Sequence, residues 1–411
     1  MQFTQLGLSQ PLLAGLAQLG FEHATPIQAS AIPVILAGED LLASAQTGTG
    51  KTAAFALPLL QRLIETSGEQ ASLTSPIRAV RALILVPTRE LALQVHGSLQ
   101  ALARFTSLRS GLVYGGVSIA AQQAELALGM DLLVATPGRL LDHLKRGSVK
   151  LDKVAYLVFD EADRMLDMGF KDEIRAVLSH LPRARQTLLF SATLDDKVQG
   201  FSRDLLKSPK RIEVDSSNSA AKDVEQRVYA VDSDRKFALL SHLIRQGSWQ
   251  RVLVFSRKKV AVDKLVANLC QAGIASHAFH GDLTQGAREK VLQDFKQGEL
   301  QVLVATDVAA RGLDILSLDY VVNFELPYVA QDYVHRIGRT GRAGNKGVAI
   351  TLFSSEDTML LEEVEVLLDK RLPQQWLPGF EPDLTKADLF AGRNRKSAQK
   401  RRAKKRSLRK S

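Results

Sequence analysis

Short, almost uninterrupted apolar runs recur along this chain, and they constrain its fold more than any other feature. In the first half they lie at residues 40–44, 82–86, 131–135, 154–159 and 187–190. Runs of this length without polar alternation are typical of parallel strands that helices cover on both faces. Between them lie helical patterns, such as the face formed by Leu91, Val95, Leu99 and Leu102. This alternation predicts a doubly wound α/β domain with a parallel sheet.

The second half repeats the plan, with apolar runs at residues 252–255, 277–279, 302–305, 320–323 and 348–352. The small, polar residues 215–222 have the composition of a flexible linker. We therefore predict a first domain at 1–212, a linker at 213–222, a second domain at 223–371 and a C-terminal extension at 372–411. A last helix is expected at about 356–370, and the Pro-rich residues 372–379 are expected to end regular structure. Two domains on a hinge form a cleft that can close on a ligand.

Composition excludes several classes of protein. The chain has 411 residues, of which 45% are hydrophobic and 24% charged, and no apolar run approaches the ~18 residues that span a bilayer. Its first residues lack the basic start and apolar core of a signal peptide. The single cysteine, Cys270, excludes disulfides and cysteine-ligated zinc, and it is expected to be a small buried residue. A reducing cytoplasm fits this usage.

The positive charge is concentrated at the C-terminus. From Arg393 onward there are eleven Lys or Arg and no acid, so removing eleven from the net charge of +10 leaves −1 for residues 1–392. Such a tail is expected to be disordered and to attract polyanions, so that it adds salt-sensitive affinity for nucleic acid. The alternative is a tail that only increases solubility.

Residues 45–52, Ala-Gln-Thr-Gly-Thr-Gly-Lys-Thr, follow a predicted strand and open a predicted helix. In this context backbone N–H groups and a helix N-terminus surround phosphates. We expect Lys51 to reach the β- and γ-phosphates of a nucleotide and the Thr52 hydroxyl to bind Mg²⁺. Ala45 departs from the usual pattern, which begins with Gly.

Acidic residues follow the apolar run at 154–159. Asp160 is expected to hold Mg²⁺, and Glu161 is the candidate base that orients or deprotonates the attacking water. The alternative is a pair of solvated acids that cap the next helix, a role that also suits Asp163. Together with the phosphate loop, these acids predict the hydrolysis of a nucleoside triphosphate.

Phosphoryl transfer also needs positive charge beyond the γ-phosphate. Arg336, Arg339 and Arg342 are spaced by three, so on a helix they could share one face and act as arginine fingers. The alternative is a solvated basic face.

The ordered motifs resemble those of the DEAD-box RNA helicases of superfamily 2, over about residues 1–370. They stand at residues 20–28, 45–52, 87–91, 115–116, 136–139, 160–163, 191–193, 254–257, 280–288, 305–314 and 335–342. The resemblance implies two RecA-like domains that hydrolyse ATP with Mg²⁺, close on ATP and single-stranded RNA, and unwind short RNA duplexes locally. The family also tolerates Ala at the place of Ala45.

The resemblance also implies roles for individual residues. The adenine, phosphates and ribose would be bound by Phe21, Thr25, Gln28, Gln46, Thr47, Gly48, Thr49, Gly50, Lys51, Thr52 and Asp314. Arg339 and Arg342 would act as fingers, and hydrolysis would be coupled to RNA by Asp163, Ser191, Thr193 and His335. RNA phosphates would be held by Thr88, Arg89, Gly116, Thr136, Gly138, Arg139 and Thr306. An amide such as that of Gln28 can pair with the N6/N7 edge of adenine.

Several features, including the short ends and residues 378–382, resemble the bacterial RhlE-like branch, which suggests work on ribosomal RNA or in RNA turnover. Ribosomal precursors and RNA-decay proteins are the expected partners. The protein is expected to be a monomer, and no heptad pattern indicates a coiled coil. The alternative function is an ATP-gated RNA clamp or RNA chaperone that does not separate strands. Its motifs are the same, so the sequence does not distinguish it from a helicase. A DNA translocase, GTPase or transporter ATPase is disfavoured, because the sequence has no guanine-binding Asn-Lys-x-Asp and no Ser-Gly-Gly-Gln signature.

Overall fold

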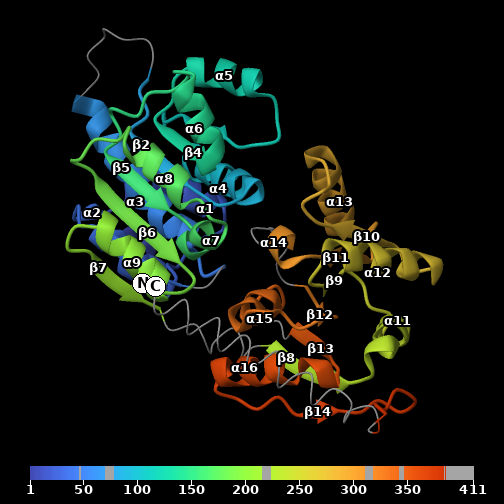
Figure 1. Ribbon diagram of the computed structural model, residues 1–411. Helices are drawn as coiled ribbons and strands as arrows, with labels where there is room; N and C mark the ends of the chain where they lie inside the picture. Colours follow the sequence, from blue (N-terminus) through green and yellow to red (C-terminus); the bar gives the residue numbers. More distant parts are fainter. Residues whose placement is uncertain are drawn as a thin grey trace. The chain divides into compact units, whose positions relative to one another are not determined.

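The computed structural model describes residues 1–45, 48–69, 78–214, 224–310, 318–341, 347–383 and 385. The chain divides into two compact units, Met1–Ser216 and Ser217–Ser411. Each unit holds a parallel sheet of seven strands with helices around it (Figure 1). The predicted fold class, two doubly wound α/β domains, is confirmed. The polar linker at 215–222 and the basic tail from Arg393 lie outside the described residues.

The first sheet has the strand order β3-β4-β2-β5-β6-β1-β7, and all its pairs are parallel. Its strands are β1 (Leu41–Ser44), β2 (Ala82–Leu85), β3 (Ser110–Val113), β4 (Leu132–Ala135), β5 (Tyr156–Phe159), β6 (Gln186–Ser191) and β7 (Lys210–Glu213). The helices of this unit are η1 (Phe3–Gln5), α1 (Gln10–Gln18), α2 (Pro26–Leu36), α3 (Lys51–Glu69), α4 (Arg89–Leu102), α5 (Ile119–Ala127), α6 (Pro137–Lys145), α7 (Ala162–Asp167), α8 (Lys171–Leu178) and α9 (Asp196–Leu205).

Two hydrophobic cores lie on opposite faces of this sheet, because successive side chains of a strand point to opposite sides. Ala82 and Ile84 of β2 belong to one core, which α1, α2, α3 and α4 cover. Leu83 and Leu85 belong to the other, which α6, α7, α8 and α9 cover. Burial on both faces explains why the strand sequences are apolar without alternation.

The second sheet has the order β10-β11-β9-β12-β13-β8-β14, again with parallel pairs. Its strands are β8 (Val224–Ala230), β9 (Val252–Phe255), β10 (Ser276–Phe279), β11 (Val302–Ala305), β12 (Tyr320–Asn323), β13 (Gly347–Phe353) and β14 (Gln374–Gln375). The helices are η2 (Ser233–Arg235), α11 (Lys236–Gln246), α12 (Lys259–Gln271), α13 (Gln285–Gln297), α14 (Asp307–Ala310), α15 (Ala330–Ile337), η3 (Ser355–Asp357) and α16 (Thr358–Leu368).

Two expectations are wrong. Regular structure does not end at Leu372, because β14 pairs with β8 and extends the sheet, while the Phe380 ring packs against His242 with 5.1 Å between centroids. Cys270 is exposed rather than buried, and its Sγ lies 3.4 Å from the Ser276 carbonyl oxygen. Among the described helices, none combines the length and apolarity needed to cross a membrane.

Candidate functional site

The loop after β1 leads into helix α3, whose first residue is Lys51. Gly48 and Gly50 have φ values of +80° and +93°, a backbone conformation that favours glycine. The Lys51 ammonium is buried and donates a 2.7 Å hydrogen bond to the Ala45 carbonyl oxygen, so its charge lies across the loop. Together with the N-terminus of α3, this arrangement suits the binding of an anion such as phosphate. Gln46 and Thr47 lie outside the described residues.

The side chain of Gln28 joins helix α2 to this loop. Its Oε1 accepts a 2.9 Å hydrogen bond from the Thr25 backbone N–H, and its Nε2 donates to the Gly50 carbonyl oxygen at 3.1 Å. A Cβ atom at Gly50 would overlap Gln28 Nε2. Glycine is therefore required there both by this close approach and by the positive φ angle. A primary amide has two N–H groups and two acceptor lone pairs, which leaves one of each for a ligand. Phe21 is half exposed, as a ring that packs against a ligand must be.

Asp160 follows β5 and is almost fully buried. Burial raises the pKa of its carboxyl to about 6, although the positive charge of Lys51 opposes that rise. Its Oδ1 accepts a hydrogen bond from the Glu161 backbone N–H at 3.0 Å. The part of the chain that the structure describes contains no cluster of three or more His, Cys, Asp or Glu that could hold a metal ion alone. Asp160 and the Thr52 hydroxyl instead offer oxygen donors of the kind that bind Mg²⁺ jointly with nucleotide phosphates.

Glu161 adopts a left-handed backbone conformation, with φ 54° and ψ 53°, immediately before α7. Its Oε2 lies 3.0 Å from Arg164 Nη1, and both side chains are buried. A non-glycine residue in this conformation stores strain that the surrounding structure must support. Arg164 is a site residue that the sequence analysis missed, although its position three residues after Glu161 at a helix start could have indicated the pair.

Asp163 lies in the first turn of α7, just after β5, and forms hydrogen bonds with the residues at the end of β6. Its Oδ2 accepts hydrogen bonds from the backbone N–H groups of Ala192 and Thr193, both at 3.1 Å, and from the Thr193 hydroxyl at 3.2 Å. Its own N–H donates to Ser191 Oγ at 3.3 Å. These bonds bring together Asp163, Ser191 and Thr193, three of the residues expected to couple hydrolysis to RNA. The alternative, in which Asp163 only caps a helix, does not explain these bonds, which reach Ser191 in β6 and the two residues after it.

The residues expected to hold RNA come from three other strand ends. Thr88 follows β2 and caps α4, where its Oγ1 accepts from the Leu91 N–H at 3.3 Å. Gly116 follows β3 with φ +85°, and a Cβ there would overlap the Arg89 guanidinium. Thr136 follows β4 and precedes α6, which carries Gly138 and Arg139. These residues lie near one another at the edge where parallel strands end, the usual place for ligands in such sheets.

The strand order separates the two groups along this edge. From β1, which leads to the phosphate loop, the sheet runs through β6 and β5 to β2, β4 and β3. The segments after β6 and β5, which hold Thr193 and Asp163, therefore lie between the residues expected to bind the nucleotide and those expected to bind RNA. The sequence motifs did not reveal this order, because strand adjacency is a property of the folded sheet.

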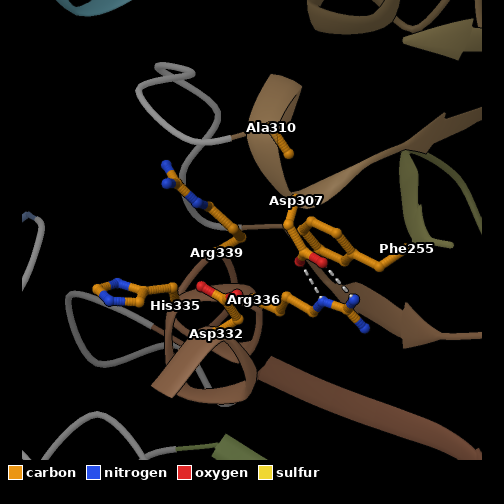
Figure 2. A pocket seen from close by; sticks show the side chains of 7 residues that line it. All are labelled: Phe255, Asp307, Ala310, Asp332, His335, Arg336 and Arg339. Atoms are coloured by element: carbon orange, nitrogen blue, oxygen red, sulfur yellow. Dashed lines mark hydrogen bonds and ion pairs between the residues drawn. The ribbon is translucent and has the colours of Figure 1, made fainter. Parts of the chain in front are cut away.

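In the second unit, Arg336 is the centre of a buried bonding network (Figure 2). Its Nε and Nη2 donate to the two carboxylate oxygens of Asp307 at 2.5 and 2.7 Å, and its Nη1 donates to Asn323 Oδ1 at 3.0 Å. The guanidinium also lies over the Phe255 ring, 4.9 Å from its centroid. These contacts make Arg336 a structural residue.

The expectation that three arginines share a helical face is wrong. Helix α15 ends at Ile337, so Arg339 lies beyond it, and Figure 2 shows the Arg336 and Arg339 side chains pointing in different directions. His335 and Arg339 both line the small pocket drawn there, with Phe255, Asp307, Ala310, Asp332 and Arg336. Thr306 is buried immediately before α14. Arg342 and Asp314 lie outside the described residues.

Known proteins agree with this arrangement. The DEAD/DEAH box helicase family model matches residues 25–201, and the helicase conserved C-terminal domain matches residues 235–344. Over 399 residues the chain is 42% identical to the ATP-dependent RNA helicase CshA of Listeria monocytogenes, covering 97% of this chain and 74% of that protein. It is 40% identical over 382 residues to the DEAD-box ATP-dependent RNA helicase CshA of Geobacillus kaustophilus, covering 93% and 80%.

Among solved structures, the chain is similar to S. cerevisiae Dbp5 bound to RNA and ADP BeF3, with a TM-score of 0.79 and 31% identity over 91% of this chain and 95% of that chain. The family models, the identity along almost the whole chain and the shared fold lead to one assignment. The chain belongs to the DEAD-box family of ATP-dependent RNA helicases, enzymes whose ATP hydrolysis RNA stimulates.

Proposed function

We propose that the first unit binds ATP through the loop after β1 and hydrolyses it with the acids after β5. Lys51 would neutralise phosphate charge from its buried position, and Glu161, held by Arg164, would orient or deprotonate the attacking water. Phe21, Thr25 and Gln28 would bind the adenine. The observation that carries the proposal is the strand order, which sets Asp163 and Thr193 between the nucleotide residues and the RNA residues.

We propose that Mg²⁺ enters with the nucleotide and is held by Asp160 and the Thr52 hydroxyl. The ion would stabilise the negative charge that phosphoryl transfer develops. The buried Asp160 carboxyl supports this assignment, because burial raises its pKa to about 6 despite the charge of Lys51, and a buried carboxylate is costly unless a cation compensates its charge. A nearby cation also favours the ionised form of the carboxyl.

We propose that RNA binds through its phosphates, with contacts that carry no sequence preference. The residues are Thr88, Arg89, Gly116, Thr136, Gly138 and Arg139 in the first unit and Thr306 in the second. Contacts to 2′-hydroxyl groups would distinguish RNA from DNA. The basic tail from Arg393 would add salt-dependent, sequence-independent affinity.

We propose that ATP and RNA together close the two units on one another and that hydrolysis reopens them, so that a short duplex loses base pairs locally. Such a closure draws on the difference in ligand affinity between two states. In the closed state Arg339 and Arg342 would reach the γ-phosphate, Asp314 would contact the ribose, and His335 would join the Asp163, Ser191 and Thr193 segments. The bonds of Asp163 to the segment after β6 support the first-unit part of this coupling.

For the cellular role we propose a monomeric helicase of the RhlE-like branch that acts on ribosomal RNA or in RNA turnover. Ribosomal precursors and RNA-decay proteins are the partners that this role requires. The cytoplasm is the proposed location, since bacterial RNA and ATP meet there.

Release of a labelled strand from a short RNA duplex tests the proposed unwinding. Wild-type protein should release the strand with ATP and not without it. Lys51→Ala should abolish release, whereas Lys171→Ala, at an exposed lysine on α8, should release at the wild-type rate. Glu161→Gln should bind ATP and RNA but stall. ATP-dependent binding of an intact duplex without release would contradict unwinding and favour an RNA clamp.

A version of the chain that ends at Gly392 tests the tail. It should bind RNA more weakly and with a shallower salt dependence, while its maximal ATPase rate stays unchanged. An unchanged salt dependence would contradict the proposed contribution of the tail to RNA affinity.

A further inference from the structure

Gln122 is a buried glutamine that bonds to two of the segments assigned to RNA. It lies on α5 with 5% of its surface exposed. Its Oε1 is 3.0 Å from Arg139 Nη1 and 3.0 Å from His143 Nε2, and its Nε2 donates to the Tyr114 carbonyl oxygen at 3.0 Å. Arg139 and His143 are four residues apart on α6, so they present one face of that helix to Gln122.

The bonding partners permit only one orientation of this amide. A guanidinium can only donate, so the atom facing Arg139 is the amide oxygen, and a carbonyl can only accept, so the amide nitrogen faces Tyr114. His143 must then donate through Nε2, so that nitrogen carries a proton. Burial and the adjacent Arg139 charge both lower the pKa of His143, which keeps it neutral.

The same network holds the glycine loop at both of its ends. Arg139 Nη1 also donates to the Val117 carbonyl oxygen at 3.0 Å, while Gln122 holds Tyr114. Gly115 and Gly116 lie between these two anchors, and Gly116 packs directly against the Arg89 guanidinium. Hydrogen bonds from Gln122 and Arg139 therefore fix the spacing between the loop 114–117 and helix α6, two segments that are separate in sequence.

We propose that Gln122 is a positioning residue for RNA binding, which fixes Arg139 and the loop 114–117 as one rigid phosphate-binding surface. This inference rests on the proposed role of Arg139 and Gly116 as RNA contacts. Because Gln122 is buried, it acts through these groups and not by touching RNA. Groups that are already in place lose less conformational entropy when the ligand binds, so affinity depends on the network.

The test is the RNA concentration that half-saturates stimulation of the ATPase, measured on the full chain with single-stranded RNA. Gln122→Met keeps the length of the side chain and removes every polar contact. It should raise the half-saturating RNA concentration about tenfold, as expected for the loss of a hydrogen bond to a charged group. The maximal rate and the KM for ATP should stay at wild-type values, a separation that a general loss of structure would not produce.

Gln123→Met is the matched control, since it makes the same change at the next residue. Gln123 Nε2 donates to Ser148 Oγ at 2.8 Å, away from the loop and from Arg139. This variant should leave the half-saturating RNA concentration unchanged. Gln122→Glu provides the test should the Met variant not fold. Its carboxylate still accepts from Arg139 but cannot donate to Tyr114 and offsets the Arg139 charge, so the half-saturating concentration should rise as well.

Arg139→Met, alone and combined with Gln122→Met, separates this inference from the proposed function. If Gln122 acts through Arg139 and the loop 114–117, the loss of RNA affinity in the double variant should be smaller than the sum of the losses in the two single variants, because the effects of coupled residues are not additive. Unchanged RNA affinity in Arg139→Met would refute the RNA site itself. Two results would overturn the role of Gln122 and leave the RNA site intact. In the first, Arg139→Met binds RNA more weakly but neither Gln122 variant does. In the second, the losses of RNA affinity in the single variants add fully in the double variant.

Discussion

The carboxylate of Asp163 is held by Thr193, whose backbone N–H and hydroxyl both donate to the same oxygen at 3.1 and 3.2 Å. The two residues come from the ends of adjacent strands, β5 and β6. On one side of these strands lies β1, which leads to the phosphate loop, and on the other lies β2, which leads to Thr88 and Arg89. A displacement at either side can therefore reach the other through this pair.

Thr193→Val tests the coupling. It removes the hydroxyl bond and keeps the shape of the side chain and both backbone bonds, so the ATP site should stay intact. We expect basal ATPase activity within about twofold of wild type and duplex unwinding reduced about fivefold, the scale of one hydrogen bond. Strand release measured beside ATP turnover checks this. Thr193→Ser keeps the hydroxyl and should behave like wild type, and equal unwinding by the Val variant would contradict the coupling.

Asp160→Asn tests how much the buried, ionised carboxyl lowers the free energy of unfolding. Burial raises its pKa from 3.8 to about 6, so the native state binds this proton more tightly than the unfolded state does. Stability therefore falls as the pH rises through this window, by about 3 kcal/mol in total at 1.36 kcal/mol per pKa unit. The amide variant lacks this cost.

The ligand-free Asp160→Asn protein should unfold at a higher temperature than wild type at pH 7.5, with a gain about half as large at pH 5. It should also lose ATPase activity, because the proposed Mg²⁺ ligand is gone. Thermal unfolding of both proteins at the two pH values measures the difference. If the rise in unfolding temperature is as large at pH 5 as at pH 7.5, the ionised Asp160 carboxyl is not the cause of the difference in stability.

Arg336→Met tests whether this arginine is structural. The change leaves the Asp307 carboxylate without its bidentate partner beside the Phe255 ring, and breaking a buried pair costs about 3–5 kcal/mol. The second unit should therefore unfold at a clearly lower denaturant concentration.

Arg371→Met is the control for that experiment. Arg371 pairs with Glu365 at 2.6 Å, but its side chain is 87% exposed, so its loss should cost at most about 1 kcal/mol. Equal effects of the two substitutions would refute the structural role of Arg336.

Most of the fold was predictable because buried parallel strands need apolar residues on both faces. Each predicted apolar run overlaps a strand, but β3, β7, β8 and β14 were not predicted. Three of these, β3, β7 and β14, are edge strands, where one side of the strand needs no neighbour. β7 has a single apolar residue, Ile212, among Lys210, Arg211 and Glu213. Such sequences carry no apolar run, and only the sheet beside them makes them strands.

The candidate site was predictable where one short segment carries several of its residues, as residues 45–52 and 160–163 do. It was not predictable where residues far apart in sequence meet. Gln122 belongs to no segment that suggested chemistry, and its role depends on the packing of α5 against α6. The arginine spacing at 336–342 wrongly predicted a shared helical face, because α15 ends at Ile337 and Gly338 follows as its C-cap.

The rate of ATP hydrolysis by the full chain, with single-stranded RNA, with single-stranded DNA of the same sequence and with neither, tests the central claim most directly. If bonds between Asp163 and Thr193 connect the nucleotide and RNA residues, RNA should accelerate turnover strongly and DNA should not. The half-saturating RNA concentration should be independent of base sequence, as phosphate contacts require. A rate that is the same in all three conditions would contradict the account.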